Sequence, residues 1–136
     1  MDYLLDVNVL VAWGWSDHSE HYRAASWIGS MVAKRNVGLF SSAIPELGFV
    51  RVSVQRTSGR LSVEEAAETL SGMLKSLGNQ HQFLVDDQSS ASEWPPWCQA
   101  ASRTTDAHLL RLALGNGVSL ATLDEGVPGA YLIPPR

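Results

Sequence analysis

The chain has little cysteine, little lysine and no long apolar run, and each shortage excludes a class of protein. The single cysteine, Cys98, cannot form an internal disulfide, which excludes a disulfide-stapled secreted fold and any cysteine-rich zinc site. No stretch approaches the ~18 consecutive apolar residues of a membrane-spanning helix. The acidic start of the sequence also lacks the basic region of a signal peptide. We therefore expect a cytoplasmic protein that does not enter a membrane.

The composition of the chain is that of an ordinary folded domain. The 136 residues are 45% hydrophobic and 18% charged, so we expect a single domain over residues 1–136 rather than disorder or a coiled coil. The formal net charge of −4 argues against a broad electrostatic grip on nucleic acid. An acidic chain can still act on nucleic acid, but only through a local basic patch or through metal ions.

Short apolar segments alternate with longer amphipathic ones along the chain. The apolar segments predict strands at 3–5, 37–40, 82–85, 118–121 and 131–133. Helical spacing and capping residues predict helices over 16–35, about 43–54, 63–77 and 106–114. This alternation is typical of an α/β fold, a three-layer α/β/α sandwich around a mostly parallel sheet.

Four acidic residues stand where a predicted strand ends or a predicted helix begins. They are Asp6, Glu46, Asp106 and Asp124. Because the carboxyl ends of parallel strands lie on one edge of a sheet, we expect these side chains to converge there. Taken singly, each is better explained as a helix cap or a turn residue, since a helix dipole favours acids in the first turn, and only the combination points to a shared site.

Convergence of acids has an electrostatic cost that points to a cation. Two carboxylates ~4 Å apart repel by roughly 4 kcal/mol at an effective dielectric constant near 20. A cluster must therefore be protonated or neutralised, and hard oxygen donors select Mg2+ or Mn2+. The residues predict a metal site suited to phosphodiester hydrolysis or phosphoryl transfer.

Four segments also have the order and approximate spacing of a known family along nearly the whole chain. They are Leu5-Asp6-Val7-Asn8-Val9-Leu10, Pro45-Glu46-Leu47 with Arg51-Val52, Thr104-Thr105-Asp106-Ala107-His108-Leu109, and Leu120-Ala121-Thr122-Leu123-Asp124. In these segments the sequence resembles the PIN-domain ribonucleases, and in particular the VapC toxins of VapBC toxin–antitoxin modules. Residues 78–98 match nothing distinctive. Glu125-Gly126 stands where the family often has a further acid and an aromatic residue, so a role for Glu125 at a second metal stays open.

The resemblance implies a PIN-like α/β/α fold and a Mg2+- or Mn2+-dependent endoribonuclease, the toxin of a type II toxin–antitoxin system. Asp6, Glu46, Asp106 and Asp124 would be both its catalytic residues and its metal ligands. A metal-bound water would attack the phosphodiester of a structured RNA such as a tRNA or rRNA.

The resemblance also implies supporting residues and partners. Asn8 and Thr122 match positions that support the pocket through hydrogen bonds, although both residue types are common in turns. Arg51 is a candidate to bind RNA. The implied partners are a VapB-type antitoxin, whose C-terminal segment covers the pocket, and a second copy of the chain in a homodimer.

Two other functions stay open. One is a PIN-fold binding module that has lost catalysis, which the presence of all four acids does not favour. The other is a receiver-like signalling domain, which needs a lysine late in the chain, whereas the two lysines are Lys34 and Lys75. Among the histidines, we expect His18 on a solvated face and His108 pointing away from the face that carries Asp106.

Overall fold

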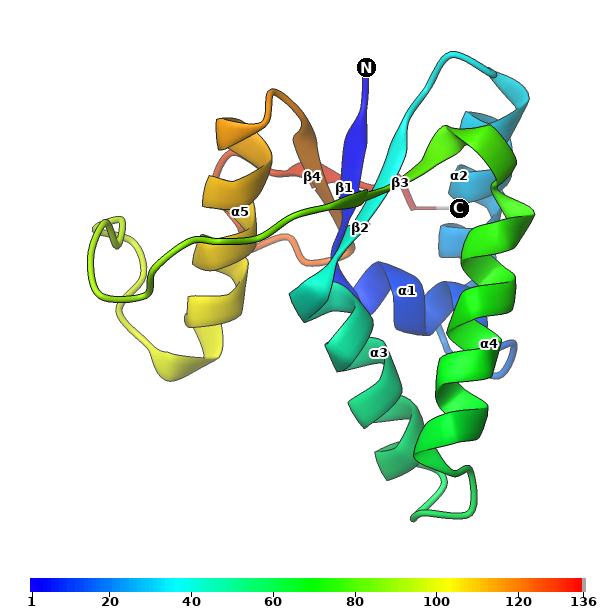
Figure 1. The fold of residues 1–136 in the computed structure, drawn as a ribbon. Coiled ribbons are helices and arrows are strands. Elements are labelled where there is room, and N and C mark those ends of the chain that lie inside the picture. The colour runs from blue at the N-terminus through cyan, green and yellow to red at the C-terminus, as the bar shows by residue number, and fades with distance from the viewer. Residues whose placement is uncertain (136) are drawn as a thin grey trace.

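A computed structural model describes residues 1–135 and confirms the α/β/α sandwich around a parallel sheet (Figure 1). The five strands pair in parallel in the order β3-β2-β1-β4-β5. The strands are β1 (Tyr3–Leu5), β2 (Leu39–Ser42), β3 (His81–Leu84), β4 (Ser119–Thr122) and β5 (Tyr131–Leu132). The helices are α1 (Val7–Gly14), α2 (His21–Ala33), α3 (Ala43–Arg56), α4 (Val63–Ser76) and α5 (Thr104–Gly115), with short 3-10 turns at η1 (Gly78–Gln80) and η2 (Ala101–Arg103).

Helices cover both faces of the sheet, and successive side chains of β1 pack alternately on one face and on the other. Leu4 packs with Leu109 and Leu112 of α5 in one buried cluster. Leu5 packs in the other cluster with residues of α2 and α3 such as Trp27 and Phe49. This alternation follows from the two-residue period of a strand, and it explains why β1, at the centre of the sheet, is apolar throughout.

The order of the strands reverses beside β1. The chain passes from β1 outward to β2 and β3, then returns through α5 to β4 on the other side of β1 (Figure 1). Leu5 pairs with Ala121 across this junction, and the Asp6 amide donates to the Ala121 carbonyl at 3.1 Å. Open α/β sheets bind ligands at such a reversal, outside the carboxyl ends of the strands.

The helix predicted over 16–35 is observed as α2, shorter at both ends, and a further helix directly after β1 was not predicted. A separate helix, α1, begins at Val7 directly after β1, and α2 begins at His21 with Glu20 at its cap position. The close approach of α1 to α3 depends on Gly48, where an added Cβ would lie 2.8 Å from the Val7 methyl groups. The other predicted elements lie within two residues of the observed bounds.

Residues 78–98, which matched nothing distinctive, include a segment that is fixed against α5. His108 Nε2 lies 2.7 Å from Asp86 Oδ2, and both side chains are largely buried. Gln88 donates to the His108 carbonyl at 3.0 Å. His108 thus serves packing, on a different side of α5 from Asp106.

None of the helices described in residues 1–135 combines the length and the apolar character needed to cross a lipid bilayer.

Candidate active site

Asp6 is a buried carboxylate at the junction of β1 and α1. The residue is only 3% exposed, because the strand before it and the helix after it both lie in the core. Oδ1 accepts the Val7 amide at 2.7 Å, which caps α1. Oδ2 accepts the Thr122 hydroxyl at 2.8 Å. The carboxylate is therefore fixed from two elements that are adjacent in the sheet.

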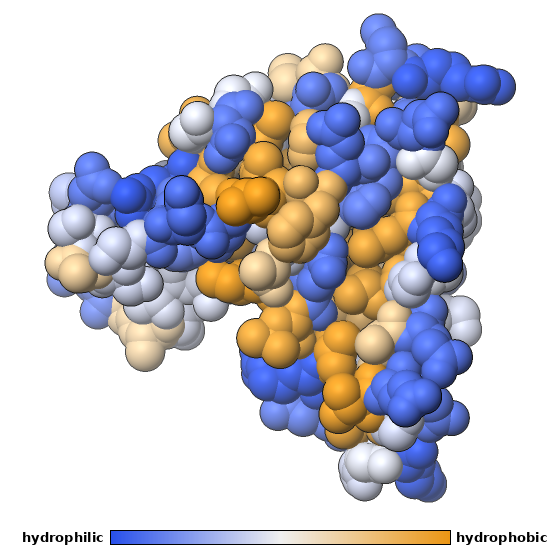
Figure 2. Space-filling model, viewed as in Figure 1, coloured by the Kyte–Doolittle hydropathy of each residue, from blue (hydrophilic) through white to orange (hydrophobic). Residues whose placement is uncertain are grey.

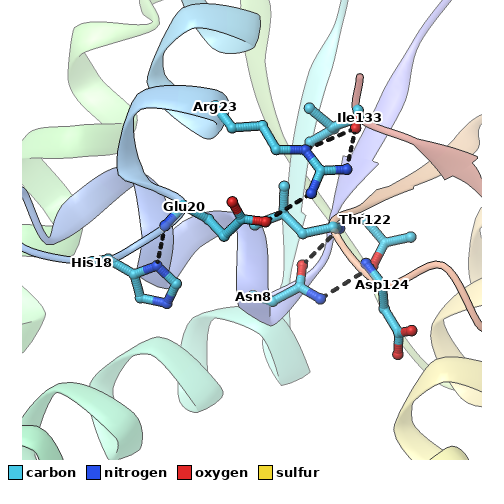
Figure 3. A network of polar contacts seen from close by, with 8 residues as sticks. Asn8, His18, Glu20, Arg23, Thr122, Asp124 and Ile133 are labelled. Carbon is cyan, nitrogen blue, oxygen red and sulfur yellow. Dashed lines mark hydrogen bonds and ion pairs between the residues drawn. The ribbon is translucent and has the colours of Figure 1, made fainter. Parts of the chain in front are cut away.

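Thr122 and Asn8 join the end of β4 to the start of α1. The Thr122 hydroxyl, fully buried, accepts Asn8 Nδ2 at 3.2 Å and the Asp124 amide at 3.1 Å. Asn8 Oδ1 accepts the Leu123 amide at 3.2 Å. Figure 3 shows Asn8 reaching across to the segment that carries Thr122 and Asp124. These bonds provide the support predicted for both residues, while their effect on activity stays a prediction.

Asp106 and Asp124 lie close enough to Asp6 for their charges to raise the pKa of its carboxyl group. Burial is the main cause that raises the pKa of Asp6 from 3.8 to about 6. The hydrogen bonds from Thr122 and Val7 lower this pKa, and the nearby charges of Asp106 and Asp124 raise it further. The pKa of Asp106 is also raised, first by burial and then by Asp124, while Arg103 opposes the rise. The structure thus brings three of the four predicted acids together.

A cavity of roughly 370 Å³ opens on this cluster. Asp6 and Asp106 lie in its wall together with Asn8, and Arg51 of α3 supplies a positive charge to the same wall. His18 also lines the cavity, although it was expected on a solvated face. The helix assumed for 16–35 misplaced His18, because the chain bends between α1 and α2 before residue 21.

Glu46, the fourth predicted acid, makes its hydrogen bond to β2, and its place in one cage with the aspartates stays a prediction. Its Oε2 accepts the Ser41 hydroxyl at 2.6 Å, and Ser41 Oγ also lies 2.7 Å from His81 Nε2. Because the hydroxyl proton is directed at Glu46, His81 donates its Nε2–H to Ser41. Burial lowers the pKa of His81, and the nearby charge of Glu46 opposes that shift. Glu46 is therefore bonded to β2, and it is not among the charges that raise the pKa of Asp6.

Glu46 instead borders a groove between α3 and α4, with a volume of about 770 Å³. Its lining is largely apolar and includes Leu47, Val50, Leu70 and Leu74. Figure 2 shows hydrophobic residues gathered on this face of the molecule, over α3 and toward α4. Leu47 is exposed there although leucine favours burial.

The chemistry of the three aspartates fits a hard divalent cation. Asp6, Asp106 and Asp124 offer carboxylate oxygens, and a cation would relieve the repulsion that helps to raise the pKa of Asp6. Within residues 1–135, however, no three histidine, cysteine, aspartate or glutamate side chains already stand in the geometry of a metal site.

Comparison with curated proteins finds relatives along almost the whole chain. The chain is 38% identical to ribonuclease VapC38 of Mycobacterium tuberculosis over 126 residues, which are 91% of this chain and 86% of the relative. It is 35% identical to ribonuclease VapC39 over 132 residues, covering 93% of this chain and 91% of the relative. It is 34% identical to ribonuclease VapC44 over 139 aligned positions, covering 96% and 94%. No family model matches the chain.

Proposed function

Because this chain belongs to the PIN-domain VapC ribonuclease family, we propose that it is a Mg2+- or Mn2+-dependent endoribonuclease and the toxin of a type II toxin–antitoxin system. One observation carries the proposal beyond the family name. Asp6, Asp106 and Asp124 meet beside β1, where the strand order reverses, and burial and mutual repulsion raise the pKa of Asp6. Carboxylates whose pKa is raised by burial and by neighbouring negative charges are typical of functional sites.

The proposed ion would be held by Asp6, Asp106 and Asp124, and by Glu46 once its carboxylate leaves Ser41. A divalent ion at such a site lowers the pKa of bound water and stabilises the charge of a phosphodiester under attack. The chain's own contribution is orientation. Thr122 fixes the Asp6 carboxylate, and Asn8 fixes Thr122.

We propose a structured RNA, such as a tRNA or rRNA, as the substrate. The chain carries a net charge of −4, so its phosphate contacts have to be local. Arg51 supports this proposal, because it shares the wall of the cavity with Asp6 and Asp106. A guanidinium placed there would contact the RNA backbone near the acids.

We propose a VapB-type antitoxin, a homodimer and a cytoplasmic location as the biological context. The groove between α3 and α4 supports the antitoxin in particular. Its apolar lining suits an amphipathic segment, and its wall includes Glu46. A segment lying in this groove would cover one of the four predicted acids.

The receiver-like alternative loses support from the positions of the lysines. Lys34 caps the end of α2, and Lys75 lies in the groove between α3 and α4. The cavity wall that contains Asp6 includes neither of them.

RNA cleavage by the purified protein tests the proposed function. Labelled bulk tRNA and rRNA are incubated with the protein in Mg2+, in Mn2+ and in EDTA. We expect cleavage in both metals, none in EDTA, and none by Asp106→Asn in any buffer. Asp87→Asn is the matched control, because it removes an exposed acid from the loop before α5, outside the cluster. Unchanged cleavage by Asp106→Asn, or full cleavage in EDTA, would refute the proposal.

A further inference from the structure

Arg103 places a guanidinium beside the aspartates without a strong bond to any of them. It is the last residue of η2 and directly precedes α5, so its position relative to Asp106 is set by the start of that helix. Its Nε lies 3.7 Å from Asp106 Oδ2, which is within ion-pair range but beyond a hydrogen bond. Nε is also buried and finds no hydrogen-bond partner among the described residues.

Two neighbours hold the guanidinium over the segment that carries Asp124. Trp97 offers its ring face, whose centroid lies 5.4 Å from the guanidinium carbon. On the other side, a Cβ added to Gly126 would stand 2.8 Å from Arg103 Nη1 and 3.3 Å from Asp124 Oδ1. Arg103 therefore lies against the Asp124–Gly126 turn while its Nε faces Asp106.

This geometry is unlike that of a simple internal counter-ion. An arginine that only neutralises a carboxylate usually makes two short parallel hydrogen bonds to it. Here the nearest carboxylate oxygen stays 3.7 Å from Nε, and a buried donor remains unpaired, which costs free energy. Because that donor is closed to solvent, an anionic ligand at the rim would accept instead from the terminal Nη groups of the guanidinium, whose side chain is 31% exposed.

We propose that Arg103 is an RNA-binding residue that donates to a phosphate oxygen at the rim of the acidic cluster. This inference rests on the proposed ribonuclease function, because an RNA backbone must approach three aspartates for that function. Arg103 offsets part of their repulsion, and its planar group sets where the phosphate sits relative to Asp106 and Asp124. Trp97 packs on the guanidinium, and the missing side chain of Gly126 leaves the space in which the guanidinium lies.

Binding of fluorescently labelled bulk tRNA in EDTA tests this role apart from cleavage. Affinity is measured by anisotropy over a series of salt concentrations. We expect Arg103→Gln to weaken binding about tenfold, the loss typical of a hydrogen bond to a charged group. We also expect it to reduce the slope of log K against log salt by about 0.7–0.9, the value of one phosphate contact. Arg35→Gln is the matched control, since it removes the same charge at the opposite edge of the sheet, before β2.

Two further variants separate orientation from charge and from folding. Arg103→Lys retains the charge without the planar fork, so we expect an intermediate affinity. Gly126→Ala pushes the guanidinium aside without changing any charge, so we expect weaker binding with an unchanged unfolding transition. With Mg2+ present, Arg103→Gln should raise KM more than it lowers kcat.

The outcomes distinguish the two proposals. If Arg103→Gln and Gly126→Ala both bind tRNA as the wild type does, with the same salt slope, Arg103 is a counter-ion and the inference is refuted. If the Arg103→Gln variant does not fold, the tRNA affinity of the Gly126→Ala variant alone decides whether Arg103 contacts the RNA. If the protein binds tRNA through Arg103 but cleaves nothing in Mg2+, the ribonuclease proposal fails while the assignment of Arg103 as a phosphate contact stands.

Discussion

Replacing Asp6 by asparagine should abolish cleavage and yet stabilise the metal-free protein at neutral pH. The pKa of Asp6 is raised from 3.8 to about 6, mainly because the carboxylate is buried. At about 1.4 kcal/mol per unit, the ionised side chain costs the fold about 3 kcal/mol at pH 8. Asparagine removes that cost and keeps an oxygen for the Val7 amide.

The gain is smaller than 3 kcal/mol because one hydrogen bond is lost. The Thr122 hydroxyl donates to Asp6 and already accepts from Asn8 and the Asp124 amide, so it cannot also accept from an asparagine NH2 group with good geometry. Losing that bond costs about 1 kcal/mol, which leaves a net gain of about 2 kcal/mol. For a chain of this length, the melting temperature should rise by about 6 °C.

The pH dependence has a definite sign. The folded-state pKa lies above the unfolded value, so the proton on Asp6 stabilises the wild type at low pH. That stability is lost as the pH rises from about 4 through about 6. Asp6→Asn should lack this fall, so the difference between the two proteins should grow across this window.

Urea and thermal unfolding in EDTA at pH 5 and pH 8 measure both effects. Asp87→Asn serves again as the control for loss of an exposed acid, and we expect its stability to follow the wild type at both pH values. Divalent metal should then stabilise the wild type and leave Asp6→Asn unchanged, since a ligand stabilises the state that binds it. An Asp6→Asn protein that is less stable than the wild type at pH 8 would refute the claim that Asp6 is maintained at an energetic cost.

Three other substitutions have expected outcomes that separate the site from the scaffold. Thr122→Val removes the hydroxyl that orients Asp6, and it should lower the cleavage rate at least tenfold and the free energy of unfolding by about 1–3 kcal/mol. Ser62→Ala removes the cap that accepts the Glu65 amide at 3.0 Å, and urea unfolding should show a loss of about 1 kcal/mol with cleavage unchanged. Leu109→Ala empties a fully buried position between α5 and the sheet, and the same unfolding assay should show a loss of about 2–5 kcal/mol; a loss under 1 kcal/mol would contradict the packing described.

The parts of the site that local sequence could predict are those at the sheet edge. Asp6 follows an apolar strand, and Asp124 follows another, so a parallel sheet requires both to leave by the same edge. The structure places them near one another, because the Thr122 hydroxyl donates to Asp6 Oδ2 and accepts the Asp124 amide. That inference needed strand direction alone, and not the exact register.

Glu46 shows what local sequence could not predict. Its partner Ser41 lies in β2, and Ser41 meets His81, which opens β3. Leu39 pairs with His81 across these strands, so Ser41, two residues further on, shares the face of β2 that reaches His81. This contact depends on the order and register of strands about forty residues apart, which no short motif encodes.

Helix α1 was missed for a related reason. Residues 7–12 are apolar apart from Asn8 and rich in valine, a residue that favours strands, so their pattern does not distinguish a helix from an extended segment. The available signal was Asp6, an N-cap residue directly before the run. Burial against α2 and α3 then decides the conformation, which is a tertiary effect.

Anomalous diffraction from crystals soaked in Mn2+ tests the central claim most directly. The account predicts a manganese peak within coordination distance, about 2–2.3 Å, of carboxylate oxygens from Asp6, Asp106 and Asp124, and no peak in crystals of Asp6→Asn. A peak confined to the Glu46–His81 pair, or its absence at the three aspartates with Mn2+ in excess, would contradict it.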